Sequence, residues 1–128
     1  MRVDWRALAR QEGFRVSSDD SISVPVGSSS QVISVDDSFS ADALRLQSVI
    51  ATGKILDAVV DTTYLRYAWE RNRFSDLVGF TVDRRQRLLG ESWVPLDGLQ
   101  SKELALQLRE LARVCDWHEF RLTGENIE

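Results

Sequence analysis

Cysteine and histidine are nearly missing from this sequence of 128 residues, which has one of each, Cys115 and His118. A single cysteine cannot form a disulfide within the chain, and this favours a reducing compartment. Histidine and cysteine ligands hold a metal ion only where at least three of them converge. The sequence therefore predicts no metal centre of this kind, and it contains no pattern that indicates a cofactor.

Long apolar segments are also lacking. No run approaches the roughly 18 apolar residues of a membrane-spanning helix, and the charged N-terminal stretch MRVDWRALARQEGF lacks the apolar core of a signal peptide. The formal net charge is −4 at pH 7, whereas domains that bind nucleic acid usually present a basic face. We therefore expect a cytoplasmic protein that binds neither membranes nor nucleic acid.

What remains is the composition of an ordinary folded domain. Hydrophobic residues make up 43% of the chain and charged residues 28%, which is typical of soluble globular proteins. A chain of this length can build one modest core without disulfides. We expect residues 1–128 to form a single domain.

Apolar periodicity predicts three helices and five strands. Helical spacing marks both ends of the chain and one central segment, while alternation of apolar and polar residues marks the strands. The predicted helices cover residues 4–13, 62–73 and the segment from Ser101 onward, and the predicted strands cover 21–26, 31–37, 43–51, 76–83 and 88–95. Residues 55–60 fit either the end of a strand or the start of a helix.

These elements follow the order α-β-β-β-α-β-β-α. Short turns join 21–26 to 31–37 and 76–83 to 88–95, so each pair is expected to form an antiparallel hairpin. Hairpins combined with separate helices are typical of the α+β class. We expect a mainly antiparallel five-stranded sheet with flanking helices.

Candidate catalytic groups are few. Cys115 and His118 are three residues apart on a predicted helix, so a cysteine–histidine nucleophile pair is conceivable. Cys115 also continues the apolar face of Leu104, Leu108 and Leu111, which favours a small buried hydrophobic residue. The many carboxylates lie mostly in turns and at helix starts, where they cap or face solvent. We predict no enzyme and no catalytic residue, and we keep catalysis by Cys115 or a carboxylate pair as a third hypothesis.

A dense charged patch, WERNR, occupies residues 69–73. It is first of all a charge cluster at a helix end, because cations complement the partial negative charge there and Glu70 can pair with Arg73. Arginine also offers a bidentate fork for carboxylates. The patch therefore has a second interpretation, a clamp for a carboxylate or a peptide, and both stay open.

Four tryptophans lie in four different predicted elements. One interpretation is that all four close one small core. Trp93, however, alternates with Leu89 and Glu91 on a predicted strand, and a strand face that carries glutamate beside tryptophan is not simply buried. Tryptophan is enriched where one protein surface covers another, so the pattern indicates a sheet face that a partner covers.

The motifs RLLGESWVPLDGL and SKELALQLRELARVCDWHEF, the ending LTGEN and the order of elements resemble the YbjN-like family. They also resemble the related class I type III secretion chaperones, which bind peptide segments. The segment NRFSDLVGFTVD at 72–83 is similar to the asparagine-ended helix that leads into the fourth strand of that family. The resemblance implies a bacterial, non-enzymatic protein that binds an extended segment of a partner protein, commonly as a homodimer.

These observations lead to one main hypothesis. We expect a peptide- or protein-binding module of chaperone type, whose partner-binding face is built from the sheet around Trp93 and the helix at 62–73. The alternative is a small regulatory or immunity-type protein that binds and blocks one folded partner. The expected partner-binding residues are Trp69, Arg71, Arg73, Glu91 and Trp93.

Overall fold

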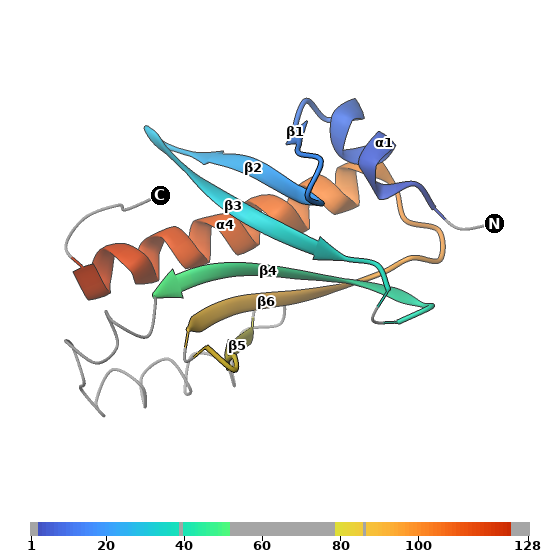
Figure 1. Ribbon diagram of the computed structural model, residues 1–128. Coiled ribbons are helices and arrows are strands. Elements are labelled where there is room, and N and C mark those ends of the chain that lie inside the picture. The colour runs from blue at the N-terminus through green and yellow to red at the C-terminus, as the bar shows by residue number, and fades with distance from the viewer. Residues whose placement is uncertain (1–2, 39, 52–78, 86, 124–128) are drawn as a thin grey trace.

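The computed structural model describes residues 3–38, 40–51, 79–85 and 87–123. Figure 1 shows the described helices and strands in space. Their bounds are α1 Trp5–Gln11, β1 Arg15–Val16, β2 Ser21–Val26, β3 Ser29–Asp36, β4 Ala43–Ala51, β5 Gly79–Val82, β6 Leu88–Pro95 and α4 Ser101–Thr123. The helix expected at 62–73 and the ambiguous segment 55–60 lie outside the described residues.

The strands of the described residues form one sheet in the order β1-β2-β3-β4-β6-β5, and every neighbouring pair is antiparallel. The α+β class and the five predicted strands with flanking helices are confirmed. The sheet gains a strand that the sequence did not reveal, the two-residue β1, which pairs with Ile22 and Ser23 of β2. Residues 24–26 of β2, including Pro25, therefore lie at the edge of the sheet that the described residues form, where proline is tolerated.

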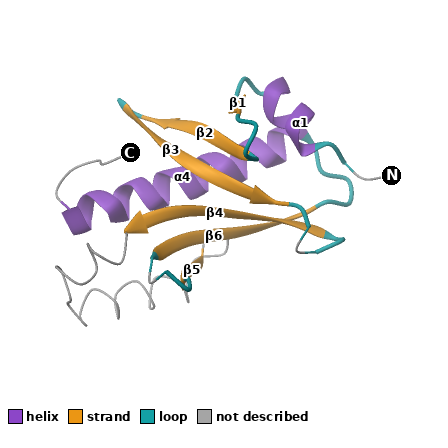
Figure 2. Cartoon of the chain, in the orientation of Figure 1, coloured by secondary structure: helices purple, strands orange, loops and turns teal. Residues whose placement is uncertain are grey.

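Helix α4 covers one face of the sheet, so the described part of the molecule has two layers (Figures 1 and 2). Its apolar side fills the space between the layers, and the predicted face of Leu104, Leu108, Leu111, Ala112 and Cys115 is buried. Alternate residues of the strands meet it, because successive side chains of a strand point to opposite faces. The sheet side of this core is formed by Ile22, Val24, Ile33, Val35, Leu44, Leu46, Ile50 and Val94.

Helix α1 packs at the end of the sheet where α4 begins (Figure 2). The Asp4 carboxylate caps it by accepting the backbone N–H groups of Arg6 at 3.1 Å and Ala7 at 3.4 Å. Trp5 is buried, and its indole Nε1 donates to Asp37 at 3.2 Å. This bond ties the first turn of α1 to the end of β3.

The core also contains a polar cluster between the sheet and the second half of α4. The Gln31 amide donates to Glu119 at 3.4 Å, and its carbonyl oxygen accepts from the Ser48 hydroxyl at 3.0 Å. Cys115 and His118 are buried beside this cluster. Cys115 has no exposed surface, so its interpretation as a small buried residue is confirmed. Its thiol lies 3.9 Å from the Ser48 carbonyl oxygen.

Candidate functional site

The sheet face opposite α4, which we call the outer face, is where the structure places the predicted site residues that it describes. On β3, β4 and β6 the side chains of one parity enter the core, and those of the other parity point outward. The outward side chains are Val32, Ser34 and Asp36 of β3, Arg45, Gln47 and Val49 of β4, and Leu89, Glu91 and Trp93 of β6.

The strand register sorts these side chains into rows that run across the sheet. In the charged row Arg45 stands between Asp36 on one side and Trp93 on the other. In the polar row Gln47 stands between Ser34 and Glu91. In the apolar row Val49 is opposite Leu89, and Val32 completes the row from β3.

Trp93 is the large hydrophobic side chain of the charged row. Its side chain is 43% exposed although it sits in the interior of β6. Its cross-strand neighbour Arg45 is held by a 2.9 Å ion pair with Asp36. The Ser38 hydroxyl and backbone N–H donate to Asp36, and these bonds, followed by Arg45, lower the pKa of its carboxyl. Arg45 is therefore fixed beside Trp93 by a carboxylate that stays ionised at neutral pH.

Two of the five predicted site residues, Glu91 and Trp93, lie two positions apart on the outer face. Trp69, Arg71 and Arg73 lie outside the described residues. The interpretation that all the tryptophans close one core is wrong: Trp5 is buried, whereas Trp93 is exposed and Trp117 of α4 is 39% exposed.

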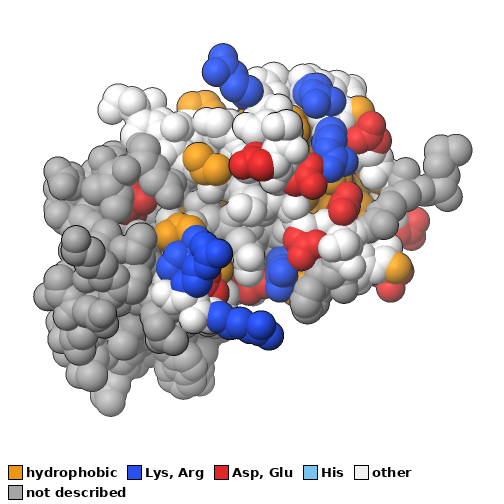
Figure 3. Space-filling view, in the orientation of Figure 1, with side chains coloured by type: hydrophobic (Ala, Val, Ile, Leu, Met, Phe, Trp, Pro, Cys, Tyr) orange, Lys and Arg blue, Asp and Glu red, His pale blue; other side chains and the backbone are white. Residues whose placement is uncertain are grey.

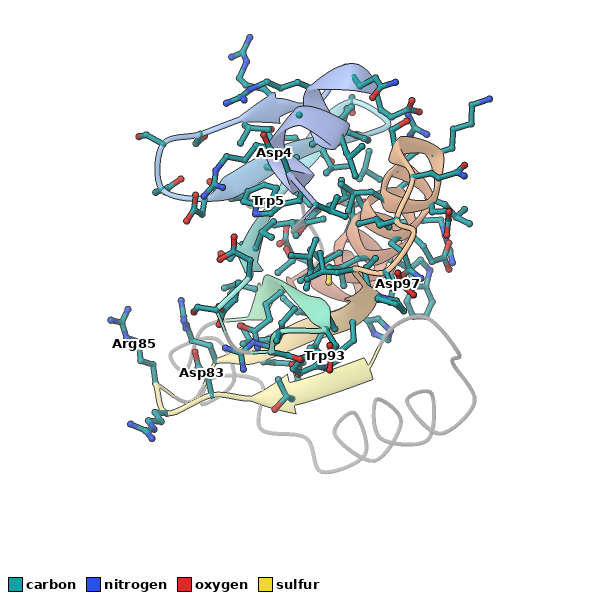
Figure 4. All side chains as sticks on the ribbon, turned by 90° about the vertical axis from the view of Figure 1, so that its right-hand side faces the viewer. Asp4, Trp5, Asp83, Arg85, Trp93 and Asp97 are labelled. Carbon is teal, nitrogen blue, oxygen red and sulfur yellow. The ribbon has the colours of Figure 1, made fainter. Side chains whose placement is uncertain are left out.

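The turn between β5 and β6 borders the outer face, because Arg87 lies next to Gln47 and Leu89 there. The sequence predicted it only as a hairpin turn and not as part of the site. The Asp83 carboxylate accepts the backbone N–H groups of Arg85 and Arg87, both at 2.9 Å, and forms a 2.7 Å ion pair with the Arg87 guanidinium. Figure 4 shows Asp83 and Arg85 at the end of β5, with Arg85 projecting on the side away from α4. The signal in the sequence is an aspartate followed by three arginines between two strands.

A hollow of about 170 Å³ opens on the outer face beside this turn. It is lined by Val32, Ser34, Gln47, Val49, Arg87 and Leu89. Figure 3 shows the same face with hydrophobic side chains next to a group of basic ones, while acidic side chains gather toward the other end. The outer face thus carries an exposed tryptophan at one end and, at the other, a hollow lined by apolar, polar and basic side chains.

Two further properties of the described residues bear on the site. No helix in the part of the chain that the structure describes is long and apolar enough to cross a membrane. Over the same ranges, no group of three or more histidine, cysteine, aspartate or glutamate side chains could hold a metal ion.

Comparison with known proteins identifies the fold. The sequence matches no protein-family model, and no curated protein matches it. The structure is similar to a chain in the HopA1–SchA chaperone–effector complex, with a TM-score of 0.57 and 12% identity over 91% of this chain and 94% of that chain. It is also similar to the Yersinia pestis type III secretion chaperone SycH, solved in complex with a stable fragment of YscM2.

For the SycH structure the TM-score is 0.56 and the identity 15%, over 83% of this chain and 88% of that chain. The protein therefore has the fold of type III secretion chaperones, and the predicted resemblance to that fold is confirmed. The resemblance to the YbjN-like family stays a prediction.

Proposed function

We propose that this protein is a non-enzymatic binding module of chaperone type, which holds an extended segment of a partner protein against the outer face. The observation that carries the proposal is the exposure of Trp93 on the sheet face that α4 leaves uncovered. An exposed tryptophan next to an arginine is the kind of side chain that dominates binding energy at protein interfaces.

The spacing of the rows supports an extended occupant. Side chains on one face of a strand repeat about every 6.6–6.8 Å, because each residue advances roughly 3.3–3.4 Å. A segment that lies along β4 and β6 in extended form has the same repeat, so its alternate side chains meet successive rows. The fold supports the proposal too, because both similar structures named above are complexes of a chaperone, one with an effector and the other with a protein fragment.

The burial of Cys115 and His118 favours a binding protein over an enzyme that uses these two side chains. Cys115 and His118 are both buried beneath the sheet, so a substrate cannot reach the thiol without opening the core. We also propose that the protein acts as a homodimer. Leu106 of α4 is 61% exposed and supplies an apolar contact for a second copy.

The experiment begins with affinity purification of the tagged full chain from its native cells, followed by mass spectrometry and light scattering of the eluate. The retained protein is then measured for binding both as a folded domain and as overlapping synthetic peptides. Wild type is expected to bind at least one peptide, and the light-scattering mass is expected to be that of a dimer. Binding of the folded domain alone would contradict the proposal and favour an inhibitor of one folded partner.

The site is tested with a matched pair of variants. Trp93→Ala is expected to weaken peptide binding by about thirtyfold, the effect of an interface hot spot worth about 2 kcal/mol. Trp117→Ala makes the same truncation at an exposed position of α4 and is expected to change the affinity by less than about threefold. Equal effects of the two variants would remove the outer face as the site.

A further inference from the structure

The hollow on the outer face has room for one apolar side chain of a partner. Its volume of about 170 Å³ compares with about 150 Å³ for an engineered protein cavity that takes up benzene. Val32, Val49 and Leu89 line it; Val32 is 47% exposed, Val49 is half-buried and Leu89 is buried. An aliphatic side chain placed there would cover the exposed part of Val32.

Arg87, which lines the hollow, belongs to the turn between β5 and β6, and hydrogen bonds to Asp83 fix the shape of this turn. Asp83 accepts two backbone N–H groups of the turn and neutralises Arg87. Arg84 and Arg85 of the same turn are exposed. Within the described part of the chain neither guanidinium has an ion pair. Three arginines and one aspartate give this turn a net charge of +2 in a chain whose total is −4, so the turn is a local concentration of positive charge on an acidic protein.

The other side of the hollow restricts where an anion can lie. The polar row presents Ser34 and Gln47 at the hollow, and Glu91 follows next to Gln47 on β6. The Glu91 carboxylate repels a second carboxylate on its side of the hollow. An acidic group of a ligand is therefore directed toward Arg84 and Arg85, and away from Trp93.

We propose that the hollow and the arginine turn together select partner segments in which an aliphatic residue lies within one or two positions of an aspartate or glutamate. The aliphatic side chain fills the hollow, and the carboxylate pairs with Arg84 or Arg85, whose planar forks suit carboxylates. This inference rests on the proposed function and gives the chemistry of the segment that the outer face holds.

The test is selection from a random peptide library displayed on phage, with the full-length protein as bait. Wild type is expected to enrich peptides with Asp or Glu next to Leu, Ile or Val. The double variant R84E/R85E is expected to lose this preference and to bind the enriched peptides about fivefold more weakly, the effect of losing one exposed ion pair of about 1 kcal/mol. The double variant R10E/K102E changes the charge equally at exposed sites of α1 and α4 and is expected to keep the wild-type preference.

The outcomes separate this inference from the proposed function. Enriched peptides that depend on Trp93 but show no acidic preference would overturn the inference and leave the proposed function in place. An acidic preference that survives R84E/R85E would also overturn it. A library from which wild type enriches nothing would overturn both. Displacement of an enriched peptide by single-stranded DNA or phosphatidylserine vesicles, but not by its acidic analogues, would assign the turn to another anion and overturn the inference. Circular dichroism confirms that each variant is folded.

Discussion

Gln31 of β3 is a fully buried polar residue, so substituting it tests how much buried hydrogen bonds contribute to the stability of the core. Its amide donates to Glu119 of α4, and its carbonyl oxygen accepts from the Ser48 hydroxyl of β4. The same hydroxyl lies 2.9 Å from the Val32 carbonyl oxygen and shares its proton between the two acceptors. One side chain thus joins two strands to the helix that covers them.

The perturbation is Gln31→Leu, which keeps the side chain similar in size and removes both polar groups. The Glu119 carboxylate then has one donor fewer in a site without solvent, and a buried polar atom that loses its partner costs about 1–3 kcal/mol. Ser48 keeps the Val32 carbonyl as an acceptor, and the leucine gains apolar burial. We expect the free energy of unfolding to fall by about 2 kcal/mol for Gln31→Leu and about 1 kcal/mol for Ser48→Ala. The double variant should lose less than the sum, because the two residues share one hydrogen bond.

The assay is urea unfolding of wild type, the two single variants and the double variant, followed by circular dichroism. Gln11→Leu makes the same substitution at an exposed position of α1, and its unfolding free energy should stay within about 0.5 kcal/mol of wild type. A Gln31→Leu protein as stable as the Gln11→Leu control would refute the idea that buried hydrogen bonds link β3, β4 and α4. So would losses in the double variant that add to within about 0.3 kcal/mol.

Three other predictions follow from burial and from the pKa of one carboxyl. Trp5→Ala should lower the unfolding free energy by about 3–5 kcal/mol because Trp5 is buried, whereas Trp93→Ala should cost less than about 1 kcal/mol. Cys115 should resist iodoacetamide in the native protein and react in urea, as a mass shift would show, because the thiol is buried. Hydrogen bonds from Ser38 lower the pKa of Asp36, so its stabilising effect is complete above about pH 3.9 and is lost as the pH falls through the lower folded value. The stability difference between wild type and Asp36→Asn should therefore shrink in acid, and unfolding curves at several pH values measure it.

The sequence was sufficient for most strand positions, because alternation and strong breakers coincide there. Strands β2, β4 and β6 have the predicted bounds, set by the turn at Gly27, the break after Ala51 and the proline at 95. β3 begins two residues earlier than predicted, because a two-residue turn suffices where Gly27 has a φ of +59°. β1 was missed because two residues have no detectable period.

The site was harder to predict than the fold because it depends on register. The alternation of Leu89, Glu91 and Trp93 indicated a strand face that is not simply buried, and the structure shows that Trp93 on this face is 43% exposed. The alignment of Trp93 with Arg45 depends on how β4 pairs with β6, two strands that are far apart in the chain. Local periodicity carries no information about such pairing. The buried position of Gln31 follows from its parity with Ile33, but its partner Glu119 is 88 residues away.

The two faces of the sheet differ in how closely their side chains are packed. The face toward α4 consists of closely packed aliphatic residues such as Leu44 and Leu46. A substitution that changes the volume there by one methylene group already disturbs the packing. Gln47 and Glu91, on the outer face, are only half-buried, and no hydrogen bond joins either side chain to the described chain. Substitutions there can change the charge and shape presented to a partner at little cost in folding free energy. A sheet built in this way can keep one core while the outer face is adapted to a particular segment, and the arginine turn beside the hollow is where we expect that specificity to lie.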